Sequence, residues 1–67
     1  MKRFVIYRPD PNDPSSGPIV KSGHCQDRMF ELWAEQVKPL VMIEGVGRDD
    51  THRVENGRIV KIPKEQR

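Results

Sequence analysis

The sequence is poor in three features: it has one cysteine, no long apolar run and no large excess of charge of either sign. Cys25 alone cannot form an internal disulfide, and such scarcity of cysteine is typical of proteins from a reducing compartment. No apolar run approaches the roughly 20 residues that are needed to cross a bilayer. The apolar start of the chain, Phe4–Tyr7, is shorter than the core of a signal peptide. We therefore expect a protein that is made and used in a cytoplasm.

The 12 basic and 10 acidic residues leave a net charge of only +2. Proteins that are held mainly by phosphates are usually far more basic, so the charge alone names no partner. A chain of 67 residues has room for one hydrophobic core, which predicts a single domain over residues 1–67. So small a core is expected to be marginally stable without a disulfide. This favours self-association or docking on a partner protein.

The N-terminal part of the chain predicts two strands joined by a loop. Residues 3–8 are rich in β-branched and aromatic side chains, and residues 19–25 resume a strand after an interruption. Residues 9–18 hold four of the six prolines, which prevent both a helix and a regular ladder of hydrogen bonds. We predict a loop there, expected to be mobile, between two strands that pair antiparallel.

One amphipathic helix is predicted over residues 26–37. Its apolar side chains recur at spacings of three and four and therefore share one face: Met29, Phe30, Trp33 and Val37. The helix is expected to end at Lys38, because the residue before Pro39 is pushed out of helical geometry.

The C-terminal part predicts three further strands. Residues 40–43 form a continuous apolar run, typical of a strand that is covered on both faces, and we expect this strand to be the central one. Residues 52–55 and 58–62 flank Asn56-Gly57. That dipeptide supplies the positive φ values that a type I′ turn requires, so it predicts a β-hairpin.

Pro63 is expected to close the last strand, and residues 64–67 are expected to form a frayed tail. The predicted order along the chain is β-β-α-β-β-β. The predicted fold class is α+β, with one short helix packed on a small, mostly antiparallel sheet.

Cys25 and His24 stand where the second predicted strand meets the helix, and a helix N-terminus favours a thiolate. A reactive thiol also needs a base or a resolving thiol, and neither stands nearby in the sequence. Together with His52 the two residues are the candidates for a zinc site, but no C-x-x-C or H-x-x-x-H spacing joins them. We interpret Cys25 as a small apolar residue at a corner and predict neither a metal nor another cofactor.

The run Asp49-Asp50-Thr51-His52 contains the residue types of acid–base catalysis, but it is equally typical of a turn before a strand. We interpret it as a turn. Gly45-Val46-Gly47 resembles the start of a dinucleotide-binding motif, yet the third glycine and the following helix are missing. No catalytic residue is identified, so we expect a protein that is not an enzyme.

The predicted helix offers a candidate surface for binding proteins. Met29 and Trp33 belong to its apolar stripe, while Leu32 projects to one side and extends the stripe beyond what a small sheet covers. We therefore predict Met29, Leu32 and Trp33 as a candidate interaction surface.

The alternative is a small nucleic-acid-binding or regulatory module with a basic sheet edge. Its contacts would come from the first and last strands, if these are neighbours: Arg3, Arg8, Arg58 and Lys61. Lysine and arginine on an edge strand also guard against strand-to-strand aggregation, so this pattern does not by itself indicate nucleic acid.

Short motifs follow one another between Gly17 and Pro63, on either side of the predicted helix: Pro18-Ile19-Val20, Ser22-Gly23-His24-Cys25, Glu44-Gly45, Asp50-Thr51-His52 and Gly57-Arg58-Ile59-Val60. In this order they resemble small proteins and tail-fibre-type segments of tailed bacteriophages and prophages. The resemblance implies a non-enzymatic structural or accessory role through protein–protein contacts. It places the protein in the bacterial cytoplasm or in a virion, and it transfers no catalytic residue.

Overall fold

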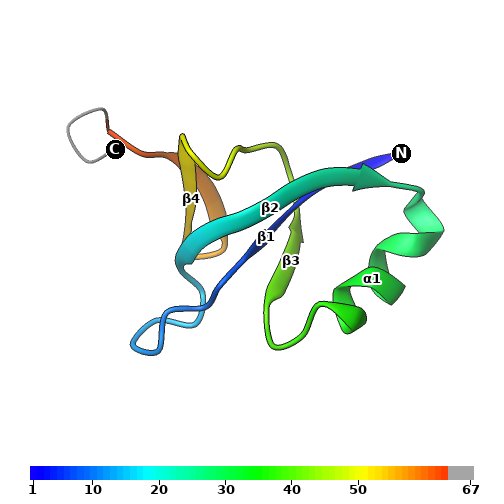
Figure 1. The fold of residues 1–67 in the computed structure, drawn as a ribbon, viewed down its shortest axis with the longest axis horizontal. Helices are drawn as coiled ribbons and strands as arrows, with labels where there is room; N and C mark the ends of the chain where they lie inside the picture. Colours follow the sequence, from blue (N-terminus) through cyan, green and yellow to red (C-terminus); the bar gives the residue numbers. More distant parts are fainter. Residues whose placement is uncertain (64–67) are drawn as a thin grey trace.

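A computed structural model describes residues 1–63 of the chain. Two long strands cross the molecule side by side, with the helix near one end and the last hairpin at the other (Figure 1). The elements in chain order are β1 (Lys2–Tyr7), β2 (Gly17–Cys25), a 3₁₀ turn (Asp27–Met29), α1 (Phe30–Gln36), β3 (Val41–Glu44), β4 (His52–Glu55) and β5 (Arg58–Lys61).

The five strands form one antiparallel sheet in the order β3-β1-β2-β4-β5. The α+β class, with one short helix on a small antiparallel sheet, is confirmed. The elements follow one another along the chain in the expected order β-β-α-β-β-β. The order of the strands in the sheet is different from their order along the chain, because β3 returns to pair with β1 on the side opposite β2. The antiparallel pairing of the first two strands is also confirmed.

The central position that we predicted for residues 40–43 is wrong. Residues 41–43 belong to β3, which continues to Glu44 and is an edge strand, and the strand buried on both faces is β1. All four side chains from Phe4 to Tyr7 are buried. The apolar run at 40–43 does contribute to both faces of the sheet, but only β1 lies beside it.

Two small cores lie on opposite faces of the sheet, because side chains alternate along each strand. The face covered by α1 buries Phe4, Ile6, Cys25 and Met42. The other face, which the β4–β5 hairpin helps to cover, buries Val5, Tyr7, Ile19 and Val54. Strand β1 supplies two of the four buried side chains in each core, so it contributes more to both cores than any other strand.

The helix is shorter than the predicted span of 26–37, since its first turn is 3₁₀ and α1 ends at Gln36. Its predicted apolar face is confirmed, because Met29, Phe30, Trp33 and Val37 all pack against the first core. The rings of Trp33 and Phe4 meet edge to face, with centroids 5.9 Å apart. No helix within residues 1–63 is long and apolar enough to span a membrane.

The loop predicted at residues 9–18 is present but ends where β2 begins at Gly17, and its side chains and main chain are hydrogen-bonded; its mobility stays a prediction. The carboxylate of Asp13 accepts hydrogen bonds from the hydroxyls of Ser15 and Ser16, both at 2.7 Å. These bonds lower the pKa of Asp13 below its usual value. The loop also reaches the last hairpin, since the N–H of Gly57 donates to the carbonyl of Ser15 at 2.8 Å.

The hairpin predicted at Asn56-Gly57 is confirmed. Asn56 and Gly57 have φ values of 52° and 74°, and Glu55 pairs with Arg58 across a two-residue turn. Strand β5 ends at Lys61 rather than at Ile62. The predicted tail at 64–67 lies outside the described residues.

Candidate docking surface

The outer edge of β3 carries main-chain groups that no described strand covers. The N–H of Gly45 donates to the carbonyl of Arg3 on β1, at 2.9 Å. Because N–H and C=O groups alternate sides along a strand, those of Ile43 also face β1. Those of Met42 and Glu44 therefore face outward, where a further strand would pair with them.

The other free edges of the sheet are protected. Strand β5 is polar at both ends, with exposed Arg58 and Lys61, and charged side chains of this kind oppose strand addition. Strand β2 pairs with β4 only at Gly17 and Pro18, and beyond Val20, which has no partner on β1, its free edge is polar, with exposed Lys21, Ser22 and His24. β3 is left as the apolar, regular edge of the described sheet.

An apolar groove runs beside this edge on the face that carries α1. It has a volume of about 680 Å³, and we call it the β3 groove; its lining is Ala34, Lys38, Pro39, Leu40, Val41 and Met42. Lys38 is the one charged residue in this lining and pairs with Glu35 at 3.1 Å on the exposed side of the helix. An apolar groove next to open main-chain donors and acceptors suits an added strand with apolar side chains.

The predicted interaction surface on the helix is divided by the structure. Met29 and Trp33 are partly buried and pack against the first core, so their side chains are largely committed to the fold. Leu32 is 50% exposed and takes no part in that core. Its role in binding a partner stays a prediction, and the β3 groove does not include it.

The basic residues predicted for the alternative function are not gathered on one edge. Arg3 and Arg8 lie at the two ends of β1, while Arg58 and Lys61 lie on β5. The first and last strands are not neighbours, because β2 and β4 stand between them. Nucleic-acid binding therefore lacks the continuous basic edge on which the prediction depended.

The candidates for thiol or metal chemistry are also separated. Cys25 is buried in the first core under the helix, which agrees with its interpretation as a small apolar corner residue. Its neighbour His24 is exposed and belongs to the opposite face of the sheet, and His52 begins β4. Within residues 1–63 no group of three potential ligands is placed to hold a metal ion.

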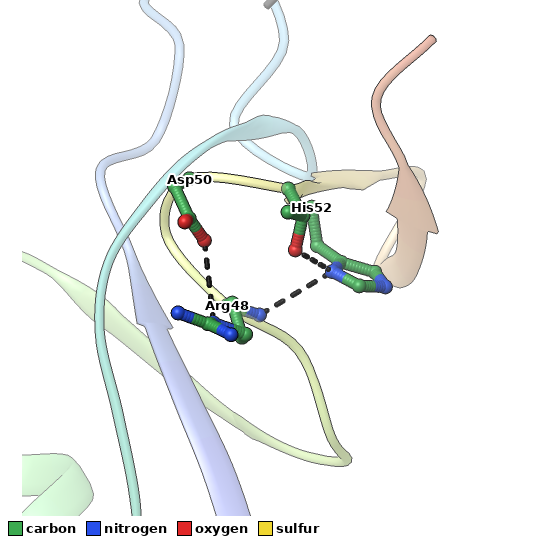
Figure 2. Close-up of polar contacts among 4 residues, drawn as sticks. Arg48, Asp50 and His52 are labelled. Carbon is green, nitrogen blue, oxygen red and sulfur yellow. Dashed lines mark hydrogen bonds and ion pairs between the residues drawn. The ribbon is translucent and has the colours of Figure 1, made fainter. Parts of the chain in front are cut away.

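The run Asp49-Asp50-Thr51-His52 forms a turn into β4 (Figure 2). Arg48 pairs with Asp50 at 3.4 Å. The N–H of Arg48 donates to Nδ1 of His52 at 3.4 Å, and the hydroxyl of Thr51 lies 2.7 Å from the same nitrogen. The carboxylate of Asp50 is thus directed to Arg48 and the imidazole nitrogen to the turn itself, an arrangement that stabilises the turn.

Sequence reasoning missed the edge position of β3 and the groove beside it. The apolar run at 40–43 signals burial equally well in a central strand and in an edge strand with covered faces.

Comparison with known proteins adds no relative: no family model, no curated protein and no solved structure matches this chain.

Proposed function

We propose that this chain functions by binding proteins, as a structural or accessory component, and that it does so by pairing the edge of β3 with β3 of a second copy. One observation carries the proposal: the outward-facing main-chain groups of Met42 and Glu44 adjoin the apolar β3 groove, while the other free edges carry protective features. No catalytic step and no cofactor enters the proposal.

A second copy suits this edge because the edge is self-complementary. When a two-fold axis relates two antiparallel strands, the same face of each strand lies on the same side of the joined sheet. Residues opposite each other are therefore both even-numbered or both odd-numbered. With Met42 opposite Met42 of the second copy, these two residues exchange N–H···O=C bonds. The N–H of Glu44 then reaches the carbonyl of Leu40 in the second copy. The N–H of Leu40 is already satisfied by the carbonyl of Val37, at 2.9 Å.

The same arrangement closes both grooves and pairs opposite charges. Both copies of α1 come to lie on one face of a continuous ten-stranded sheet, so the two β3 grooves face each other across the axis. Their apolar linings are then removed from water, which is the main driving force for association. Glu44 of one copy lies towards the end of the second copy's β3 groove that holds Lys38. The opposite charges of these two side chains favour this antiparallel register.

The setting we propose for this assembly is a phage or prophage, in the bacterial cytoplasm or in a virion. It is supported by the order of short motifs between Gly17 and Pro63. A small, self-pairing domain agrees with a structural or accessory role, because association adds buried surface to a core that is small by itself.

The test uses proline to remove one outward N–H. Glu44→Pro deletes the donor to Leu40 of the second copy and leaves the bonds between β3 and β1 intact. Lys61→Pro is the matched control. Ile62 donates to Thr51, so the N–H of Lys61 also faces outward, on the edge of β5. The oligomeric state is measured by sedimentation equilibrium, and amide hydrogen exchange is measured at two protein concentrations.

We expect the parent chain and Lys61→Pro to dimerise, with the N–H groups of Met42 and Glu44 more protected at the higher concentration. Glu44→Pro removes two hydrogen bonds per dimer, of about 1 kcal/mol each, and should raise the dissociation constant about thirtyfold. A parent chain that is monomeric at every concentration would contradict the proposal. So would a dimer that Leu32→Ala dissociates and Glu44→Pro does not, because that result assigns the interface to the helix.

A further inference from the structure

A second hollow lies away from the β3 groove, between the paired ends of β1 and β2 and the segment that follows β3. Its volume is about 110 Å³, and Phe4 and Gly23 complete a lining whose polar side chains and main-chain groups come from Arg3, Ser22, His24 and Gly45–Gly47. We call it the oxyanion hollow. It contains none of the residues that line the β3 groove.

The strand register brings three polar side chains to one side of this hollow. Arg3 and His24 are direct partners across β1 and β2, and residues opposite each other in an antiparallel pair share a face. Ser22 stands two residues from His24 and so lies on the same face. This is the face away from α1, since Phe4, the next residue after Arg3, packs in the core beneath the helix.

The charge at the hollow is positive and unneutralised. No aspartate or glutamate is among its lining residues, and within residues 1–63 Arg3 takes part in no ion pair. Glu44, the nearest acidic residue in the sequence of β3, is opposite Phe4 and therefore belongs to the other face. A guanidinium group without a carboxylate partner, beside an imidazole and a hydroxyl, favours an anion.

The segment that follows β3 borders the hollow on its other side, with Gly45, Val46 and Gly47 in the lining. The N–H of Gly45 is taken by the carbonyl of Arg3, at 2.9 Å, but the N–H groups of Val46 and Gly47 have no main-chain or side-chain acceptor within residues 1–63. Gly47 is buried, and an unpaired N–H on a buried residue is costly unless a ligand or water satisfies it. Successive free N–H groups near glycine are a common way to bind an anion.

We propose that the oxyanion hollow binds one small tetrahedral oxyanion: inorganic phosphate, or the phosphate group of a monoester. Arg3 supplies paired donors, Ser22 and His24 supply single donors, and the N–H groups of Val46 and Gly47 complete the set. The volume decides the size of the ligand. Pockets for whole small molecules are usually about 300–1,000 Å³, so a hollow of 110 Å³ admits a phosphate group and no attached base or ring.

The test follows amide resonances of labelled protein during titration with sodium phosphate, at an ionic strength held constant with sodium chloride. O-phosphoserine, a phosphate monoester, forms a second arm of the titration. Arg3→Gln removes the charge at the hollow, and Arg58→Gln removes one arginine charge elsewhere as the matched control. Both arginines are exposed, so neither variant is expected to unfold, and the amide spectrum of each variant checks this.

We expect saturable shifts at Val46, Gly47 and His24 that survive Arg58→Gln. Loss of a charged hydrogen-bonding group typically weakens binding about ten- to hundredfold, so Arg3→Gln should abolish saturation over the same range. Binding of both probes identifies a phosphate group carried by a larger molecule as the ligand, and binding of phosphate alone identifies the free ion. Shifts that do not saturate, or that Arg3→Gln and Arg58→Gln reduce equally, would overturn the proposal.

Discussion

At the scale of single residues, Tyr7 offers the clearest test of how burial and hydrogen bonding act together. Its side chain is 3% exposed, and its hydroxyl donates to the carbonyl of Pro14 at 3.3 Å. Burial raises the pKa of Tyr7 above 10, and the negative charge of Asp13 raises it further. Both effects oppose formation of the tyrosinate inside the folded chain.

The loss of folding stability at alkaline pH is therefore expected to depend on Tyr7. Its folded pKa lies above its unfolded value, so its contribution is complete below pH 10 and is lost as the pH rises through the folded pKa. Tyr7 is the only tyrosine, which makes absorbance of the tyrosinate a measurement at one site. We expect its titration midpoint to lie above 10 in the folded chain and to fall on addition of denaturant.

Tyr7→Phe provides the control for this titration. It should flatten the alkaline loss of stability while lowering stability near neutral pH by about 1 kcal/mol, through loss of the hydrogen bond to Pro14. A midpoint at or below 10 in the folded chain would show that the phenol is solvated and that the loop does not cover it.

At the scale of elements, the β4–β5 turn tests whether local backbone geometry alone specifies a hairpin. Gly57 has a φ of 74°, and a Cβ atom at this position would meet no other atom within 4 Å. Gly57→Ala should therefore destabilise the fold by about 1–2 kcal/mol through backbone conformation, without any clash. The measurement is denaturant unfolding followed by the fluorescence of the single tryptophan, Trp33.

Gly57→Asn is the matched comparison, because asparagine visits the left-handed region more readily than alanine. We expect it to recover part of the loss. Equal destabilisation by the two substitutions would instead indicate that added side-chain bulk beside the loop at Ser15 is responsible.

The same elements show how far the sequence specifies the fold. Asn56-Gly57 predicted its hairpin because the information is local: two residues with positive φ determine the turn and the register. The apolar run at 40–43 did not predict its place in the sheet, because strand order depends on pairing between distant segments. The hydrogen bonds of Asp13 and Ser16 in the loop could not be predicted either. The proline content indicates that a loop is present, but it does not indicate which residues the loop contacts.

The candidate sites follow the same division. The exposure of Leu32 was readable from helical periodicity. The sequence did not predict that the main-chain groups of Met42 and Glu44 face outward. It also did not predict that Arg3 lies opposite His24. Both facts follow from the register of β1 with its neighbouring strands. Periodicity gives the faces of an element, and only the sheet order gives its edges and cross-strand partners.

At the scale of the whole molecule, the distribution of charge separates protein binding from nucleic-acid binding. The affinity of a protein for duplex DNA falls with salt at a slope of about −0.9 for each phosphate contact, so four simultaneous contacts would give about −3.6. Arg3 and Arg8 are separated from Arg58 and Lys61 by two intervening strands. At most two of these residues are then expected to contact one duplex together, which gives a slope no steeper than about −1.8, or no measurable binding.

Fluorescence anisotropy of a labelled duplex, titrated at several salt concentrations, measures this slope. The variant Lys61→Gln should leave it unchanged, because β2 and β4 lie between β5 and β1 in the sheet. A slope of −3 or steeper that Lys61→Gln reduces by about one would restore the nucleic-acid function, since it requires the basic residues of both strands to meet one duplex at once. A shallow slope would exclude the nucleic-acid alternative, and the oligomeric state of Glu44→Pro would then decide the proposed pairing of the β3 edges.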